Sequence, residues 1–524
     1  MDQFKVVVIG GGIAGLTAAA YLAEQGYEPV ILEADSQWAG GRICGGHPET
    51  FVYNGKEWSF SPDQGMHAFW GGYHNLRATL KRFTDTQLIT SPGEEWINRW
   101  GREVRTVEAG NAVRNSIIPA PFHYLQLLFS PRFWRTISPW DFLSLPGFLF
   151  SISWTVGFDP IKEQRALDGL MLHDYFRLWT PNLKATFVGV GVNLLAAPEE
   201  TISLSSLIAA LRFYTVLRRD AWNMQYFPAP PAKSFVKPLL DYIESRQGGI
   251  FYGTTAIKLE QQSDGWRIIV EDAKRGGLRS LNTKYIVLAV DAPAAQRLLI
   301  ASPDTAPEAQ NLIFPNALSN AVVRIWFDTS PRAGTPGGMF TGDFVADNFF
   351  WLHRLYDEYR VWHQETGGSV IEVHIYGTHD LMSKPDSHLL VLATNDVYLA
   401  FPELRGHFVY GTVRRNLRTQ TAFRVPDHRS LWVHTPWQNL YACGDWIGFD
   451  TPTFWMERAA TTGIGAANAI LAQNNQQPIT IHHPSPPEKS VIFLSWIIKI
   501  IRVIVSPLVF GLKFMKNTQK NTSR

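Results

Sequence analysis

The sequence predicts an α/β protein: a Rossmann-type dinucleotide-binding domain, an inserted α+β substrate domain and a C-terminal amphipathic membrane helix. Three observations predict this architecture. A glycine-rich turn follows an apolar strand at the N-terminus, a second strand and helix stand near residue 440, and a basic apolar segment ends the chain. We therefore expect the two ends of the chain to form one domain together and the middle of the chain to form a second domain.

The N-terminal motif is the run Val7-Val8-Ile9-Gly10-Gly11-Gly12-Ile13-Ala14-Gly15. The apolar residues before it indicate a buried parallel strand, and the helix that follows begins at Ile13 and Ala14. Gly10 allows the tight turn, Gly12 lets the backbone approach a pyrophosphate, and Gly15 lets helix and strand pack closely. The run therefore predicts a dinucleotide site at a helix N-terminus, with a purely structural glycine turn as the alternative.

Two further positions bear on which dinucleotide is bound. Glu33 ends the second strand, where its carboxylate can accept hydrogen bonds from ribose hydroxyls. Gly41 and Arg42 follow in Gly40-Gly41-Arg42, and the guanidinium can balance the charge of a pyrophosphate. An NAD site has no particular need for this cation, so the motif favours FAD.

The C-terminal motif completes the predicted FAD site. Gly444 and Asp445 follow a short apolar segment, and Met456 lies at the start of a predicted helix over residues 454–471. An acid at this place can bind ribitol hydroxyls, and a helix N-terminus can stabilise negative charge on a reduced isoalloxazine. The alternatives are a turn role for Asp445 and a first-turn helix acid for Glu457.

The expected domains are discontinuous in sequence. We expect an FAD-binding domain of residues 1–75, 245–300 and 430–475, a substrate domain of residues 76–244 and 301–429, a linker at 476–490 and an amphipathic membrane-anchoring helix at 491–516. Strands are expected at residues 251–260, 265–271 and 285–290, as a meander that returns to the parallel sheet. Residues 76–244 look mostly helical, and residues 320–420 look rich in strands.

The composition excludes some classes of function. The chain has 524 residues, a net charge of +2 and no basic repeat that would indicate nucleic-acid binding. Its only cysteines, Cys44 and Cys443, have no metal-ligand spacing, so no metal site is expected. Aromatic residues are abundant, with 19 Trp, 32 Phe and 17 Tyr, while charged residues make up only 18%. This balance favours a large apolar ligand or a lipid surface.

The C-terminal segment has the pattern of an interfacial helix. Lys499, Arg502 and Lys513 fall on one polar stripe of an otherwise apolar helix, which suits an anionic membrane surface. Docking on the protein's own core or on a second subunit is the alternative. Residues 142–158 carry no charge and suggest an interfacial or buried hairpin, with the buried form favoured. We expect peripheral membrane attachment on the cytoplasmic side of a bacterium or cyanobacterium.

These motifs resemble the flavin amine oxidase and phytoene desaturase superfamily over nearly all of residues 1–475. The run Asp63-Gln64-Gly65-Met66-His67-Ala68-Phe69-Trp70-Gly71-Gly72-Tyr73-His74-Asn75-Leu76 is similar to a run in plant- and cyanobacterial-type carotenoid desaturases. The run Met456-Glu457-Arg458-Ala459-Ala460-Thr461-Thr462-Gly463 looks most like the isorenieratene synthase-like branch, which makes aromatic carotenoid end rings.

The resemblance implies an FAD-dependent carotenoid desaturase that moves a hydride from an allylic C–H of a polyene to flavin N5. It implies a hydrophobic carotenoid-like substrate, aromatic end rings as one product class, and an adenine contact near Ala256. His67 is the candidate near the flavin, either catalytic or packed. The rings of Phe69, Trp70 and Tyr73 are candidates to stabilise the allylic cation.

Other interpretations remain open at this stage. A cluster of arginines suggests a solvated or domain-interface group, or a site that steers a quinone electron acceptor; its members are Arg212, Arg218 and Arg219. The alternative functions are a flavin amine oxidase, a carotenoid isomerase that uses reduced flavin, and a non-catalytic prenyl-binding escort protein without flavin.

Overall fold

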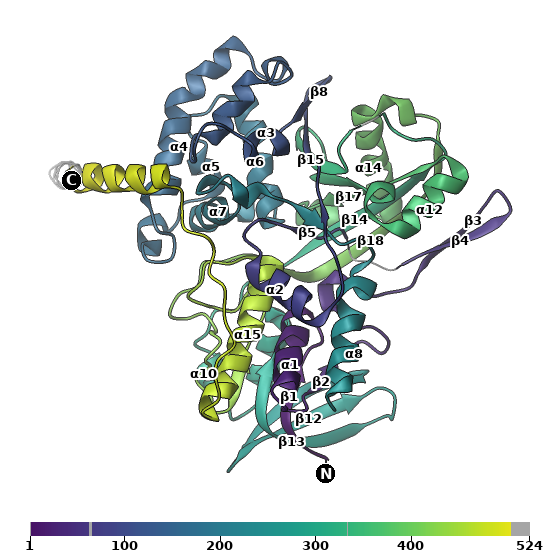
Figure 1. The fold of residues 1–524 in the computed structure, drawn as a ribbon, viewed down its shortest axis with the longest axis vertical. Helices are drawn as coiled ribbons and strands as arrows, with labels where there is room; N and C mark the ends of the chain where they lie inside the picture. The colour runs from purple at the N-terminus through teal and green to yellow at the C-terminus, as the bar shows by residue number, and fades with distance from the viewer. Residues whose placement is uncertain (1, 62–64, 333, 505–524) are drawn as a thin grey trace, which may run out of the picture.

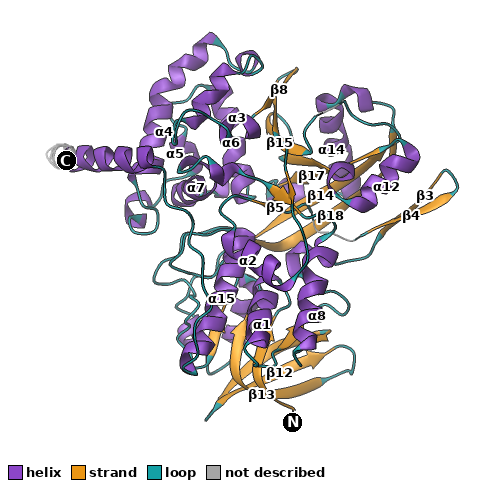
Figure 2. Cartoon of the chain, in the orientation of Figure 1, coloured by secondary structure: helices purple, strands orange, loops and turns teal. Residues whose placement is uncertain are grey.

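The computed structural model describes residues 2–61, 65–332 and 334–504, and two seven-stranded sheets organise these residues. The sheets lie toward opposite ends of the molecule, and helices cover them (Figure 2). The first sheet has the strand order β10-β2-β1-β13-β12-β11, with β19 also paired to β13. The second has the order β18-β14-β17-β16-β15-β7-β8.

The first sheet is the predicted Rossmann-type sheet. Its parallel part comprises β1 (Asp2–Ile9), β2 (Val30–Glu33), β10 (Gly249–Tyr252), β13 (Leu278–Leu288) and β19 (Leu440–Ala442). The antiparallel strands β11 (Thr254–Gln262) and β12 (Gly265–Asp272) lead into β13, which confirms the predicted meander. The helices α9 (Ala292–Ala301) and α10 (Ala306–Ala309) follow.

Both ends of the chain meet on this sheet. Helix α1 (Ile13–Glu24) lies beside α15 (Trp455–Gln473), with α8 (Lys237–Ser245) near them (Figure 1). The close approach of α1 and α15 needs a glycine, because a Cβ at Gly463 would lie 2.6 Å from the Ala14 carbonyl oxygen. The expected discontinuous domain therefore has a tightly packed seam between its two ends.

One predicted strand is wrong. The expected strand at residues 251–260 is split at Gly253, whose φ of +66° interrupts extended backbone. The first piece, β10, pairs in parallel with β2, and the second, β11, pairs with β12. Apolar alternation runs through both pieces, so the pattern alone hides the change of partner.

The second sheet carries the middle of the chain. Its strands are β7 (Glu95–Trp100), β8 (Glu103–Glu108), β14 (Ala317–Phe327), β15 (Gly337–Gly342), β16 (Asn348–Trp351), β17 (Ser369–Ile375) and β18 (Phe408–Thr421). The helices nearby are α11 (Leu352–Leu355), α12 (Asp357–Thr366), α13 (His379–Met382) and α14 (Asp386–Ala400). The expected helical block thus contributes β7 and β8, and the strand-rich block also contains helices.

A helical unit covers one side of the second sheet (Figure 1). It contains α3 (Gly110–Arg114), α4 (Leu145–Gly157), α5 (Leu172–Tyr175), α6 (Pro181–Leu195) and α7 (Leu204–Leu211). Helix α2 (His74–Phe83) instead lies beside α15 and α8. Short strands complete the fold: β3 (Glu49–Tyr53) with β4 (Lys56–Phe60), and β5 (Ala68–Phe69) and β6 (Ile89–Thr90) with β9 (Gln225–Tyr226). The hairpin expected at residues 142–158 is wrong, because Pro146 falls in the first turn of α4, where proline is tolerated.

The predicted linker is held against the body. The His482 amide donates to Asn75 Oδ1 at 2.8 Å, Arg218 donates to the Ser485 carbonyl at 2.7 Å, and Arg219 pairs with Glu488 at 2.9 Å. Two of the three clustered arginines therefore fix this segment at a domain interface.

A helix follows at residues 489–504 and stands out from the body (Figure 1). The rest of the predicted anchor, residues 505–516, lies outside the described residues. Among the helices in the described part of the chain, none is long and apolar enough to cross a bilayer.

Candidate active site

The carboxyl ends of the parallel strands open onto a cavity of about 580 Å³. The cavity is lined by most of the predicted cofactor residues, namely Gly10, Gly12, Ile13, Ala14, Glu33, Gly41, Arg42, Gly444, Asp445 and Met456. Ligands of open α/β sheets bind at this edge. The structure therefore brings the motifs from both ends of the chain to one place.

The glycine turn has the shape of a phosphate cradle. Gly10 has a φ of +108°, and a Cβ at Gly15 would overlap the Gly10 carbonyl oxygen. At Gly12, by contrast, a Cβ would meet no protein atom within 4 Å, so open space lies over the N-terminus of α1. Backbone N–H groups and the helix dipole face this space, which fits a pyrophosphate.

Glu33 lies against the glycine turn. Its carboxylate accepts hydrogen bonds from the Gly11 amide at 3.0 Å and from the Asp35 amide at 2.9 Å. Burial raises the pKa of Glu33. The structure does not bring Ala256 to the cavity, since it lies in β11; Ile250 of β10 is nearer, 3.6 Å from where a Gly11 Cβ would lie.

Arg42 and Asp445 meet across the site. Arg42 Nη2 lies 2.6 Å from Asp445 Oδ2, and both residues line the cavity. The Gly444 amide donates to Thr462 Oγ1 at 2.9 Å, which ties the turn to α15. The two charges expected to serve the pyrophosphate and the ribitol thus hold each other in place, within reach of a ligand in the cavity.

Glu457 has a role that the sequence motif does not reveal. Its Oε1 accepts from the Asn75 amide and Asn75 Nδ2, both at 2.8 Å, and its Oε2 accepts from the Leu76 amide at 2.9 Å. Burial raises the pKa of Glu457 to about 7, although these hydrogen bonds act to lower the pKa. Glu457 therefore caps the N-terminus of α2 and joins the two motif runs.

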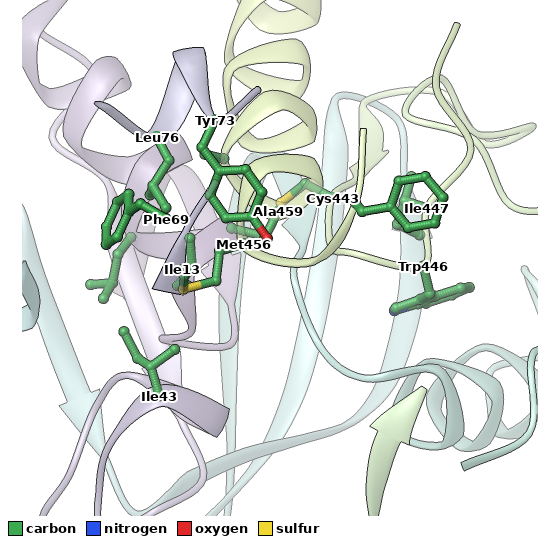
Figure 3. Close-up of a cluster of buried hydrophobic side chains, with 14 of the residues drawn as sticks. Ile13, Ile43, Phe69, Tyr73, Leu76, Cys443, Trp446, Ile447, Met456 and Ala459 are labelled. Carbon is green, nitrogen blue, oxygen red and sulfur yellow. The ribbon is translucent and has the colours of Figure 1, made fainter. Parts of the chain in front are cut away.

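The aromatic run divides between cavity and core. Trp70 and Tyr73 line the cavity, whereas Phe69 is fully buried and packs on Phe227, with ring centroids 4.8 Å apart. Figure 3 shows Tyr73 near Ile13, Met456 and Ala459, which line the same cavity. Within β5, Ala68 faces the cavity and Phe69 faces the opposite side. Asp63 and Gln64 of this run lie outside the described residues.

His67 lines the cavity as a neutral group. Burial and the nearby His374 lower the pKa of His67 to about 4, so the imidazole is uncharged at pH 7. Its Nδ1 has no hydrogen-bond partner among the described residues. This nitrogen is itself buried in the cavity wall.

A polar wall also lines the cavity. Its members are Asn193, Asn320, Asn348, His374, Tyr376, Asn416 and Gln420. Asn193 lies on α6, and the others lie on β14, β16, β17 and β18 or directly after β17. These strands are far apart in sequence, yet Val322 of β14 and Asn348 of β16 both pair with His374. The sequence did not predict this wall, although polar positions of β17 alternate with apolar ones.

These features together fit FAD. A glycine turn with open space above it, an acid at the end of β2 and an Arg42–Asp445 pair at the end of β19 provide for the phosphates and hydroxyls of a dinucleotide. The remaining cavity, with Trp70, Tyr73 and the polar wall, leaves space for a substrate.

Known families match most of the chain. The NAD(P)-binding Rossmann-like domain matches residues 8–83, and flavin containing amine oxidoreductase matches residues 171–471. The first match contains the glycine turn, and the second spans the polar wall and the C-terminal motif.

Individual relatives are distant but cover much of the chain. A carotenoid phi-ring synthase from Streptomyces griseus is 27% identical over 494 residues, 90% of this chain and 88% of that protein. A probable zeta-carotene desaturase from Synechococcus elongatus is 23% identical over 339 residues, 62% of this chain and 66% of that protein. Among solved structures, cyclohexylamine oxidase from Brevibacterium oxydans is 16% identical with a TM-score of 0.63, covering 90% of this chain and all of that one.

Proposed function

Because this chain belongs to the family of flavin-containing amine oxidoreductases, we propose that it is an FAD-dependent carotenoid desaturase. The relative named carotenoid phi-ring synthase, which matches 90% of the chain, is the observation that carries this proposal, and it favours aromatisation of an end ring. The runner-up is desaturation along the polyene chain, which the zeta-carotene desaturase relative supports.

Hydride transfer to flavin requires few catalytic side chains. Bound FAD would accept a hydride from an allylic C–H of the polyene. The indole of Trp70 and the phenol of Tyr73, both in the cavity wall, would offer their negative faces to the allylic cation that remains. We place the neutral His67 beside them as a positioning group rather than a charged base.

Pigment analysis tests the proposal. Bacteria that accumulate β-carotene should form a carotenoid with an altered end ring when they express this chain. HPLC of the pigments detects this product. A longer chromophore in strains that accumulate phytoene, ζ-carotene or lycopene would indicate the runner-up. No change in any strain, with flavin bound to the protein, would contradict a carotenoid substrate and favour an amine.

We further propose that an apolar face attaches the protein to a membrane. Two neighbouring segments carry most of the exposed large apolar side chains: Phe129, Trp134, Trp140, Phe142, Leu143, Leu145, Leu149, Phe150 and Leu178 around α4, and Ile492, Phe493, Trp496, Ile500, Ile501, Val503 and Ile504 on the helix at 489–504. Trp140 is 76% exposed and Trp496 is 60% exposed. Clusters of this kind mark interaction sites.

The two segments are joined by direct contacts. Arg502 donates to the Gly157 carbonyl at 2.6 Å, pairs with Glu163 at 2.6 Å and lies 3.7 Å from the centroid of the Phe158 ring. Tryptophans at the edge of an apolar surface, with Lys489 and Lys499 nearby, suit the headgroup region of an anionic bilayer. A lipid surface would also be the source of a carotenoid.

Vesicle flotation tests this face. Replacing Trp140 and Leu143 with Ser should reduce binding to phosphatidylglycerol vesicles at least tenfold, since each buried side chain contributes about 1.5 kcal/mol or more. Removal of residues 489–524 should do the same. A control with Val361 and Val391 changed to Ser, both exposed on other helices, should float like the wild type. If the Trp140 and Leu143 variant floats like the wild type, the face around α4 does not bind the membrane. Attachment would then be through residues 489–524 alone.

A further inference from the structure

A hydrogen-bonded chain of three titratable side chains ends at the cavity wall. The Tyr376 hydroxyl lies 3.1 Å from His374 Nδ1, and His374 Nε2 lies 2.8 Å from Glu372 Oε1. Tyr376 and His374 line the cavity, and Glu372 is fully buried behind them. The Asn348 amide donates to the same Tyr376 hydroxyl at 3.2 Å.

The partners of Glu372 determine which atom donates and which accepts in each of these hydrogen bonds. Arg324 donates to Glu372 Oε2 at 2.7 Å, and the Met66 amide donates to Oε1. Burial raises the pKa of Glu372, but Arg324 and His374 together hold this pKa well below its usual range. The carboxylate therefore only accepts hydrogen bonds. His374 Nε2 must therefore carry the proton that it donates to Glu372.

The opposite nitrogen of His374 then accepts from Tyr376. With its proton on Nε2, His374 donates to Glu372 and keeps a lone pair on Nδ1, and this tautomer satisfies both partners. The Nδ1 lone pair accepts the Tyr376 hydroxyl hydrogen, and Tyr376 lines the cavity.

We propose that Tyr376 is the catalytic residue that removes the proton after hydride transfer, and that His374 receives the proton that Tyr376 releases. This inference rests on the proposed function. Hydride transfer to bound flavin would carry away two electrons and a proton and leave an allylic cation. This cation would then lose a second proton to the Tyr376 oxygen. The electrons of that C–H bond form the new double bond. The Tyr376 proton moves to His374 Nδ1, and Glu372 stabilises the resulting imidazolium.

Three of the other acids that line the cavity are hydrogen-bonded or paired: Glu33 accepts from the Gly11 amide, Asp445 pairs with Arg42, and Asp291 caps α9. The fourth, Glu94, lies 3.8 Å from Arg114, and its carboxylate oxygens have no hydrogen-bond partner among the described residues. The allylic cation is a strong acid, so a phenol with a proton acceptor behind it is sufficient as a base. Tyr376 is therefore the described group best placed for the step.

The test compares Tyr376→Phe with Tyr398→Phe in the flavin-loaded, full-length protein, using the carotenoid that the wild type converts. Tyr398 lies on α14 and does not line the cavity, so its variant is the matched control. Tyr376→Phe should keep its flavin spectrum and its affinity for the carotenoid but turn over about 100-fold more slowly. His374→Gln, which can still donate to Glu372 but cannot take up the proton, should show the same loss.

Normal turnover in Tyr376→Phe would overturn the inference while the proposed function stands. A wild type that binds flavin but converts no carotenoid would overturn both. If Tyr376→Phe does not fold, His374→Gln decides: turnover near the wild-type value would overturn the relay, and a loss of about 100-fold would support it.

Discussion

Replacing Gly12 with Asp should abolish FAD binding while leaving the apoprotein folded. Gly12 has a φ of −77° and a ψ of −177°, which any residue adopts, and a Cβ there would meet no protein atom within 4 Å. Gly12 is also the N-cap of α1, where Asp is favoured. The new carboxylate would occupy the phosphate cradle and repel the pyrophosphate. We expect FAD affinity to fall at least about 100-fold, which corresponds to about 2.7 kcal/mol.

The measurement is flavin absorbance after reconstitution, with thermal unfolding of the apoprotein as a check on folding. Gly249→Asp is the matched control, because a Cβ at Gly249 also meets no atom within 4 Å but lies at the start of β10, outside the cavity. It should bind FAD normally. Full flavin loading of Gly12→Asp would contradict the assigned phosphate cradle.

Replacing Glu457 with Ala should cause the largest loss of stability. The change leaves the Asn75 and Leu76 amides, at the N-terminus of α2, without their acceptor in a buried place. Orphaned buried donors cost about 1–3 kcal/mol each, so we expect a loss of about 3 kcal/mol. Tyr73, which precedes α2 and lines the cavity, should lose its position with the helix.

Urea unfolding followed by tryptophan fluorescence, at pH 6, measures this loss. Because burial raises the pKa of Glu457 to about 7, its contribution to stability falls as the pH rises through 7. Glu24→Ala is the control: Glu24 also pairs with α2, through Arg82, but at the surface, so its loss should cost 1 kcal/mol or less, on the order of a surface ion pair. Asn75→Ala combined with Glu457→Ala should be less than additive, since the two residues share one network. Equal losses at Glu24 and Glu457 would contradict the capping role.

The nucleotide-binding part of the fold was predictable because its signals are local. Strand β1, the glycine turn and α1 follow one another in sequence, and Gly10 and Gly15 have steric reasons that hold in any such turn. The partner of a strand is not a local property. The break at Gly253, which separates β10 from β11, therefore escaped prediction.

The substrate part of the site was less predictable for the same reason. The sequence predicted a strand-rich block at residues 320–420, which contains β17. The function of the polar face of β17 depends on β14 and β16, which bring Arg324 and Asn348 to Glu372 and His374. Similarly, the motif runs located Glu457, yet its partner Asn75 stands 382 residues earlier in the chain. Motifs gave positions for these residues, and tertiary packing determined their roles.

The most direct test of the central claim uses the purified, flavin-loaded protein under anaerobic conditions. Addition of β-carotene, or of the acyclic precursor identified by pigment analysis, should bleach the oxidised flavin absorbance, with one new carbon–carbon double bond formed for each flavin reduced. Flavin that stays oxidised with every carotenoid but is bleached by an amine would contradict the account and identify the cavity as an amine oxidase site.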